Sequence, residues 1–239
     1  MMDENFFSDE RRQRYARQIM IPEIGEAGQK KLAAARVLVI GAGGLGSPAV
    51  MYLAAAGVGV IGIADGDSAE LSNLQRQVIH SEASLGRNKA ESAAEFIRRL
   101  DPEVQVHIIG DFLDEVGLRK IIGGYDFVLD CVDRPDIKLM INDVCVDVGK
   151  PFCHGGVRNF GGQVMTWLPG FPDLREVMGE GFGADNGSKG IIGMACGICG
   201  SVQALEAVKF ITGAGRLLTG KIFVFDGLNL KFGVLGDEK

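Results

Sequence analysis

The chain has 239 residues, of which 46% are hydrophobic and 23% charged, as expected for a globular protein with a sizeable core. A net charge of −6 argues against general nucleic-acid binding. The N-terminus is polar, and the longest apolar stretch, residues 49–64, is broken by glycines, so neither a signal peptide nor a membrane span is indicated. Five cysteines in a chain of this size are typical of free thiols in a reducing compartment, and we expect a cytoplasmic protein.

Residues 1–35 predict an amphipathic helical arm rich in Arg and Gln. In residues 36–150, short apolar β-branched runs alternate with helical patterns. The expected strands are RVLVI at 36–40, GVIGIAD, VQVHIIG and YDFVLD, and the expected helices follow the GAGGLGS loop, span 86–100 and span 136–148. Such alternation predicts a Rossmann-like, doubly wound and mostly parallel sheet.

Residues 151–239 have a different pattern. PFCHGGV and GGQVMTWLP predict two strands, and KIFVFDGLNLKFGVL predicts a hairpin that turns at Asp226-Gly227. Residues 191–212 predict an apolar helix, and the aperiodic segment 169–190 predicts a long mobile loop. We therefore expect one α/β domain over 1–239, with a nucleotide-binding half at 36–150 extended by antiparallel strands at 151–239.

A glycine loop directly follows the first predicted strand. Gly41, Gly43 and Gly46 fit the G-x-G-x-x-G pattern, in which the backbone approaches a phosphate at a helix N-terminus. Asp65 ends the second predicted strand, where an acid accepts hydrogen bonds from ribose hydroxyls. These residues predict a nucleotide, and taken alone they would favour the NAD of a dehydrogenase.

Charged residues after Asp65 favour a different nucleotide. Asn73 and Arg76 lie just beyond the predicted sheet edge, Lys89 precedes a helix, and Asp133 is expected to end the fourth strand. Two cations and a carboxylate at one edge suit a triphosphate with Mg²⁺ better than a dinucleotide. We therefore expect ATP and Mg²⁺ as cofactors.

Several motifs in order along the chain carry a resemblance to a known family. They are RxxRYARQ, GAGGLGS, D-x-D, SNLQRQ, GxxKAE, DCxD, GGxRxxGGQ and GSVQALEAVK, between Arg11 and Lys209. The chain resembles the ThiF/MoeB/HesA family, bacterial relatives of ubiquitin-activating enzymes. The resemblance implies an adenylyltransferase, usually a homodimer, that uses Mg-ATP to adenylate the C-terminal glycine of a small ubiquitin-like sulfur carrier of the ThiS or MoaD type.

The resemblance also assigns roles to residues of this sequence. Arg14 is implied to reach the partner subunit's site, where a cation stabilises the leaving pyrophosphate as an arginine finger does. Arg76, Lys89 and Asp133 complete the implied catalytic set, with Asp133 as the Mg²⁺ carboxylate. The implied nucleotide-binding residues are Gly41, Gly43, Gly44, Gly46, Asp65, Asp67, Asn73, Arg76 and Lys89.

The chain departs from the family at three places. Asp173 and Glu176 stand where relatives carry the first CxxC of a structural zinc site, and the chain ends in GDEK where the second is usual. Cys196-x-x-Cys199 lies in an apolar helical pattern and provides two of the four ligands that a tetrahedral site needs, so we expect no zinc site. The crossover-loop cysteine of many relatives is absent near Asn186, which makes a thioester step doubtful, and Arg134 replaces a usual Asn.

Other functions stay open on these residues. The same site could adenylate a peptide, a small molecule or a tRNA-bound carboxylate, although the acidic charge disfavours tRNA. An NAD-dependent oxidoreductase and a catalytically silent nucleotide-binding partner are alternatives of other classes. The sequence assigns no chemical role to Cys131, Cys145, Cys153, Cys196 or Cys199.

Overall fold

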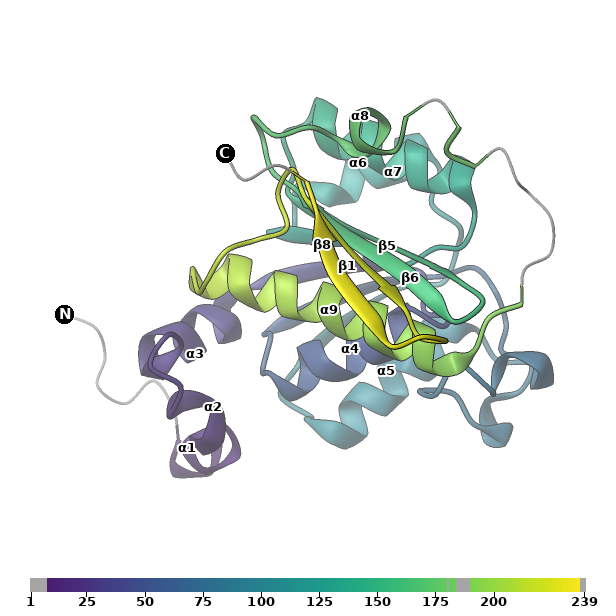
Figure 1. Ribbon diagram of the computed structural model, residues 1–239. Helices are drawn as coiled ribbons and strands as arrows, with labels where there is room; N and C mark the ends of the chain where they lie inside the picture. Colours follow the sequence, from purple (N-terminus) through teal and green to yellow (C-terminus); the bar gives the residue numbers. More distant parts are fainter. Residues whose placement is uncertain (1–7, 180, 184–189, 237–239) are drawn as a thin grey trace.

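The computed structural model describes residues 8–179, 181–183 and 190–236, and within them the strands form one sheet of eight (Figure 1). Its order is β3-β2-β1-β4-β5-β6-β7-β8. The first five strands in this order run parallel, and the last three add antiparallel pairs. The strands are β1 (Arg36–Ile40), β2 (Val60–Ala64), β3 (Gln105–Ile109), β4 (Phe127–Asp130), β5 (Phe152–Arg158), β6 (Gly161–Trp167), β7 (Ile222–Asp226) and β8 (Lys231–Leu235). The expected α/β fold is confirmed.

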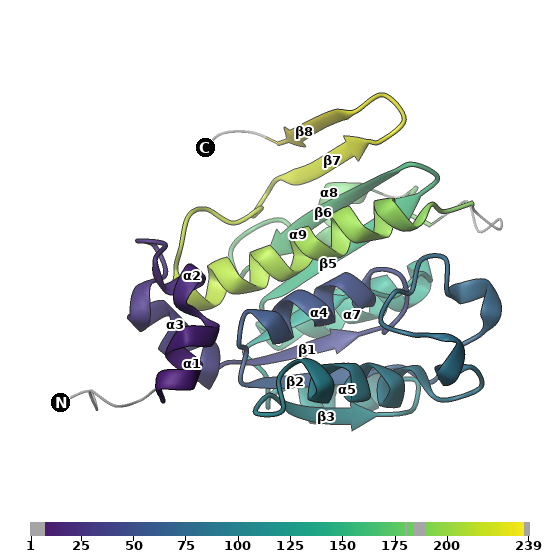
Figure 2. The same cartoon turned by 90° about the horizontal axis from the view of Figure 1, so that it is seen from below.

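Helices cover both faces of the sheet, as the two perpendicular views show (Figures 1 and 2). One face carries α4 (Gly46–Ala55), α5 (Lys89–Leu100) and α9 (Gly193–Thr212), and the other carries α6 (Glu115–Ile122), α7 (Pro135–Asp147) and α8 (Leu174–Met178). The predicted arm consists of α1 (Asp9–Arg14), α2 (Ala16–Ile19) and α3 (Gly25–Ala34). Because both sheet faces are covered, the central strands are apolar throughout rather than alternating.

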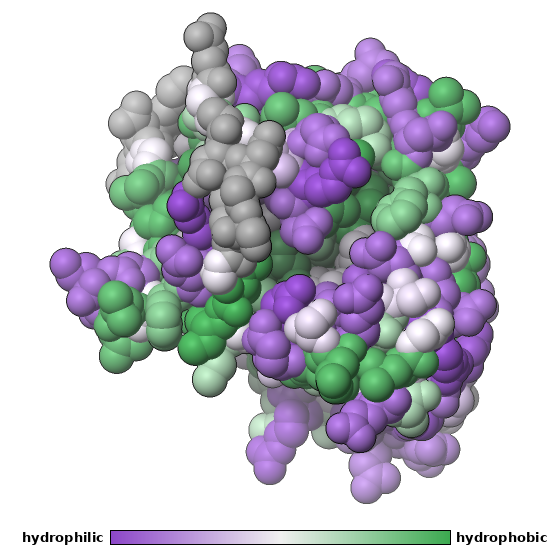
Figure 3. All heavy atoms as spheres, turned by 90° about the vertical axis from the view of Figure 1, so that its right-hand side faces the viewer, coloured by the Kyte–Doolittle hydropathy of each residue, from purple (hydrophilic) through white to green (hydrophobic). Residues whose placement is uncertain are grey.

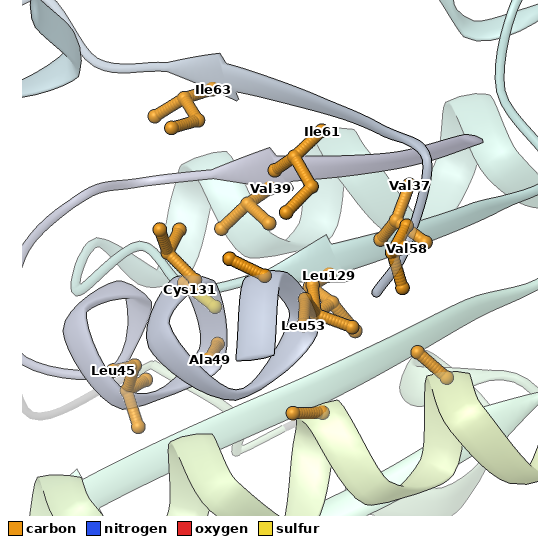
Figure 4. Close-up of a cluster of buried hydrophobic side chains, with 14 of the residues drawn as sticks. Val37, Val39, Leu45, Ala49, Leu53, Val58, Ile61, Ile63, Leu129 and Cys131 are labelled. Atoms are coloured by element: carbon orange, nitrogen blue, oxygen red, sulfur yellow. The ribbon is translucent and has the colours of Figure 1, made fainter. Parts of the chain in front are cut away.

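The larger core cluster lies between β1, β2, β4 and the helices α4 and α9. Val37, Val39, Ile61 and Leu129 are fully buried there, and Leu53 of α4 packs among them (Figure 4). The same cluster contains residues of the C-terminal half, such as Ala195, Cys199, Ala204 and Phe225. The two halves of the chain therefore share one core.

Two helices differ from the sequence expectations. The helix α6 was not expected, and α8 forms inside the segment 169–190 that was expected to be a loop. Asp173 and Glu176 explain α8, because each side chain accepts a hydrogen bond from the other residue's backbone N–H in a capping box. Residues 180 and 184–189 of that segment, with Asn186, lie outside the described residues.

The 20-residue α9 is long and apolar enough, by length and composition alone, to cross a membrane. In the structure it packs against the sheet and α4, and it buries three polar side chains, those of Gln203, Glu206 and Thr212. Glu206 accepts hydrogen bonds from Thr166 Oγ1 at 2.6 Å and from the Leu218 N–H at 2.8 Å. Because its buried polar side chains have partners within the fold, α9 is a core helix of this domain.

Candidate functional site

The glycine loop lies between β1 and α4 at the carboxyl edge of the sheet. Gly41 has a φ of +98°, which favours glycine, and a Cβ on Gly46 would lie 2.0 Å from the Gly41 carbonyl oxygen. A Cβ on Gly44 would lie 2.7 Å from Cys196 Sγ of α9, whereas Gly43 has room. An anion at this position would face the positive end of the α4 dipole and the loop backbone, because the Ser47 and Ala49 N–H groups already donate to the Gly43 and Leu45 carbonyls and Pro48 has none.

Asp65, which directly follows β2, connects this loop to the end of that strand by a hydrogen bond. Its Oδ2 accepts from the Ala42 N–H at 2.7 Å, and its Oδ1 accepts from the Asp67 N–H at 2.9 Å. Burial raises the pKa of Asp65, although both backbone hydrogen bonds oppose the shift. Each oxygen keeps a second lone pair, so the carboxylate can still accept from a ribose hydroxyl.

Lys89 begins α5, and its side chain is 8% exposed. Its Nζ donates to Oδ2 of the exposed Asp67 at 3.0 Å. The two residues expected to contact different parts of the nucleotide therefore contact each other in the structure. An ammonium group has three donors, so this ion pair leaves donors for a phosphate.

Arg76 lies against the glycine loop, with its Cδ 3.6 Å from where a Cβ of Gly44 would be. Its guanidinium donates to the Ser72 carbonyl at 3.1 Å. Asn73, in the 3₁₀ turn Leu71–Asn73, is buried, and its Oδ1 accepts from the Glu70 N–H at 3.2 Å. The structure thus gives Asn73 a capping role, and its contact with phosphate stays a prediction.

The expectation that Asp133 ends the fourth strand is wrong. β4 ends at Asp130, and Asp133 is exposed three residues later, just before α7. The neighbouring Arg134 forms an ion pair with Asp136 of the first turn of α7. Cys131 and Val132, which precede Asp133, lie against Gly41 of the glycine loop. An exposed carboxylate at this turn is chemically suited to Mg²⁺, which prefers one or two carboxylates together with phosphate oxygens and waters.

Three charged or polar residues near this turn were missed by the sequence reasoning. Asp130 is fully buried; Lys138 Nζ donates to both of its oxygens, at 3.0 and 3.2 Å, and His154 Nδ1 lies 2.7 Å from Oδ2. Although burial opposes ionisation, Lys138 and His154 hold the pKa of Asp130 below its ordinary value. Lys138 also donates to the Gly155 carbonyl at 2.7 Å, so the cluster joins β4, α7 and β5 behind Asp133.

His80 is a fourth residue that the sequence reasoning missed, and it supports the glycine loop. Its Nε2 lies 2.9 Å from the Ala42 carbonyl, and its Nδ1 lies 2.9 Å from Ser92 Oγ of α5. Burial lowers the pKa of His80, so the ring is neutral, with Nε2–H donating to the carbonyl. The aperiodic sequence around QVIH gave no signal for this role.

Arg14 is not brought to the site of its own chain. It donates to the Leu100 carbonyl at 3.0 Å and lies 3.8 Å from Asp101, at the end of α5 opposite to Lys89. A helix of this length separates its ends by roughly 16 Å. Tyr15 reinforces the attachment, because its hydroxyl donates to Asp101 at 2.7 Å. Arg14 therefore cannot complete this protomer's site while the arm is attached to Asp101.

All five cysteines are buried free thiols. Burial raises the pKa of Cys196 and raises that of Cys199 to about 12, so neither is a thiolate near neutral pH. In the described ranges, no group of three or more His, Cys, Asp and Glu side chains is arranged to hold a metal ion. The absence of a zinc site from the whole protein stays a prediction.

The edge bearing these residues is shown face-on in Figure 3, where hydrophilic side chains gather around a recess. The structure brings together the glycine loop, Asp65, Lys89 and Arg76 at this edge. A glycine loop at a helix N-terminus, a carboxylate and two cations are chemically suited to a nucleoside triphosphate.

Comparisons with known proteins show which proteins this chain is similar to. SAMP-activating enzyme E1 of Haloferax volcanii is 40% identical over 223 residues, which cover 92% of this chain and 83% of that protein. The probable adenylyltransferase/sulfurtransferase MoeZ of Mycobacterium tuberculosis is 41% identical over 228 residues (92% and 58% covered). Adenylyltransferase and sulfurtransferase MOCS3 of Mus musculus is 41% identical over 224 residues (92% and 49%). The chain thus spans about half to three fifths of these two longer relatives.

Solved structures share the fold. MccB of E. coli has a TM-score of 0.85 at 22% identity, covering 96% of this chain and 71% of that one. PaaA has a TM-score of 0.82 at 24% identity, with 99% and 77% covered. Residues 15–238 match the ThiF family over nearly the whole chain. The chain therefore belongs to the ThiF family, whose relatives named above include adenylyltransferases and an E1-type activating enzyme.

Proposed function

We propose that this ThiF-family adenylyltransferase activates the C-terminal carboxylate of a small ubiquitin-like sulfur carrier ending in Gly-Gly, with ATP and Mg²⁺, as a cytoplasmic homodimer. The observation that carries the proposal is the joint placement of the glycine loop, Asp65, Arg76 and Lys89 at one sheet edge. The names of the relatives, an activating enzyme and adenylyltransferases, support the reaction class.

In this reaction a carboxylate oxygen of the carrier attacks the α-phosphorus of ATP. The bond from that phosphorus to its bridging oxygen breaks, so the products are an acyl-adenylate and pyrophosphate. The protein's contribution is to hold two anions together and to stabilise the charge that develops on the leaving oxygens. The glycine loop and Arg76 bind phosphate oxygens, Lys89 adds positive charge, and Asp65 positions the ribose.

Asp133 is the residue that would hold Mg²⁺, which when bound offsets charge on the triphosphate. The cluster of Asp130, Lys138 and His154 fixes the turn that carries it, because its members lie on β4, α7 and β5. Adenylation requires no nucleophilic cysteine, so the buried thiols are compatible with it.

The decisive experiment is carrier-dependent exchange of labelled pyrophosphate into ATP. Purified protein with Mg-ATP is tested with and without ThiS-, MoaD- and SAMP-type carriers, each compared with a version lacking its last two glycines. Exchange is expected only with an intact tail. No exchange with any of them would contradict the proposal.

Thermal melting separates the nucleotide classes. Mg-ATP is expected to raise the Tm, while NAD leaves it unchanged, because a ligand that binds the native state shifts unfolding by mass action. Stabilisation by NAD alone would favour an oxidoreductase instead.

A further inference from the structure

A pair of polar side chains with incomplete hydrogen bonding lies on the β5–β6 hairpin. His154 and Gly156 share one face of β5, because side chains alternate along a strand, and Gly156 is directly opposite Gln163 of β6. A Cβ on Gly156 would lie 3.4 Å from His154 Nε2 and 3.6 Å from Gln163 Nε2. The two nitrogens therefore flank a position that the glycine leaves without a side chain.

The His154 ring is 1% exposed, and its two nitrogens have different roles. Nδ1–H donates to the Asp130 carboxylate, so Nε2 carries a lone pair and acts as an acceptor. Burial, and next the charge of Lys138, lower the pKa of His154 and keep the ring neutral. Among the described residues, Nε2 has no hydrogen-bond partner. A buried acceptor without a donor is unfavourable, and it indicates a missing partner.

Gln163 is a donor whose present contact is weak. It is half-buried, and its Nε2 lies 3.5 Å from the thioether of Met178 in α8, which is a poor acceptor. A ligand carbonyl could replace this contact at little cost. An acceptor and a donor side by side match the N–H and C=O of one residue of an extended chain, which point to the same side.

The pair lies on the route to the reacting centre. His154 is in register with Asp130 at the end of β4, and the chain reaches Asp133 three residues later. Phe182, which follows α8, packs edge-on to the His154 ring with centroids 5.8 Å apart. Nε2 is covered in the structure, so a tail backbone reaches it from the side of the half-buried Gly156 by displacing the weak contact between Gln163 and Met178.

We propose that His154 and Gln163 bind the backbone N–H and C=O of one residue in the extended C-terminal tail of the acyl substrate. His154 Nε2 accepts from the N–H of that residue, and Gln163 Nε2 donates to its carbonyl. A tail of glycines suits the site, because a residue with a side chain would crowd Gly156. This inference rests on the proposed function and specifies how its substrate is held.

Two substitutions of His154 distinguish the roles of its two ring nitrogens. In His154→Asn the amide nitrogen takes the place of Nδ1 and keeps the bond to Asp130, while the Nε2 position is empty. In His154→Gln the amide extends to the Nε2 position. We expect His154→Asn to raise the KM for the carrier by about tenfold in the exchange assay, with kcat and the KM for ATP nearly unchanged. His154→Gln should restore much of the loss, and Gln163→Leu should behave like His154→Asn.

The substrate supplies the complementary test. Carriers are made semisynthetically with an ester oxygen in place of the N–H of the last or the penultimate glycine. One ester should raise the KM for the wild-type protein but have little further effect on His154→Asn, because the same hydrogen bond is already lost. If His154→Asn fails to fold, the ester carriers with wild type and Gln163→Leu still decide the matter.

An active wild type whose KM for the carrier is unchanged by these variants and esters would overturn the inference, and a bound water would then satisfy Nε2. A fall in kcat with no change in the KM for the carrier would also overturn the inference, because His154 would then act only through Asp130. A wild type without carrier-dependent exchange would overturn the proposed function, and this inference with it.

Discussion

Asp133 is the residue on which the metal role depends, and its exposed carboxylate can be removed without disturbing the core. Asp133→Ala is expected to lower carrier-dependent exchange by roughly 10²–10³-fold, because charge on the triphosphate is no longer offset. It should also abolish the extra Tm shift that Mg²⁺ adds to ATP. Asp136→Asn, an equally exposed acid three residues away, is the matched control and should keep near wild-type exchange. Equal rates for both variants would refute the metal role.

His80 makes a pH-dependent contribution to stability. Burial depresses its pKa from the ordinary value of 6.5 in the folded protein, so unfolding takes up a proton below that pH. Its contribution is present above about 6.5 and is lost as the pH falls toward the folded pKa, at up to about 1.4 kcal/mol per pH unit. Urea denaturation between pH 7.5 and 5.5 should show this fall. His80→Asn should be less stable at pH 7.5 and show a smaller slope, and an undiminished slope would exclude His80 as its source.

At the scale of elements, the junction of β1 and α4 is the most tightly packed part of the site. Gly46→Ala is expected to destabilise the protein by about 1–3 kcal/mol or more and to abolish ATP binding, because its Cβ would lie 2.0 Å from a backbone oxygen. Gly197→Ala, in the open on α9, should fold normally and bind ATP as the wild type does. Urea denaturation and calorimetric titration with ATP compare the two. Normal ATP binding by Gly46→Ala would show that the loop relaxes easily.

The helix α8 bears on the zinc prediction. Asp173 and Glu176 cap this helix reciprocally, where relatives are implied to carry cysteines. We expect elemental analysis of the purified protein to find no stoichiometric zinc. Asp173→Ala should cost about 1 kcal/mol of stability and leave the metal content unchanged. About one zinc per chain would contradict the prediction and direct attention to Cys196 and Cys199.

At the scale of the whole molecule, the position of Arg14 makes a dimeric site testable. Arg14→Ala and Lys89→Ala are each expected to be nearly inactive, because every site of each homodimer lacks one cation. After subunit exchange, a mixed dimer has one site with both residues intact. Random pairing should therefore restore up to about a quarter of wild-type exchange per total protein.

Tagged subunits verify that mixed dimers have formed. If they have, and the activity still stays at the level of the separate variants, Arg14 does not act across a dimer. The ATP site at the sheet edge would be unaffected by that result, since none of its described contacts involves the arm.

The sequence was sufficient to predict those elements and residues whose signal lies in a short stretch of the chain. The apolar runs of β1, β2 and β4 and the glycines after β1 were predicted, because strand periodicity and close backbone approach leave local signals. The cluster at Asp130 was missed, because DCVDR contains two acids and the buried one is defined by Lys138 and His154, 8 and 24 residues away. The helix α6 was missed because EVGLRKII is short and contains a glycine.

The shared core has a consequence for synthesis of the protein. Strands β1, β2 and β4 have left the ribosome long before α9, which supplies Ala195, Cys199, Ala204 and Ala207 to the same cluster. Until then, the nascent nucleotide-binding half presents an apolar surface and an unpaired edge of β4, both of which favour aggregation. Contacts between segments so distant in sequence also form slowly. We therefore expect the nascent chain to be prone to aggregation until nearly all of it has been translated.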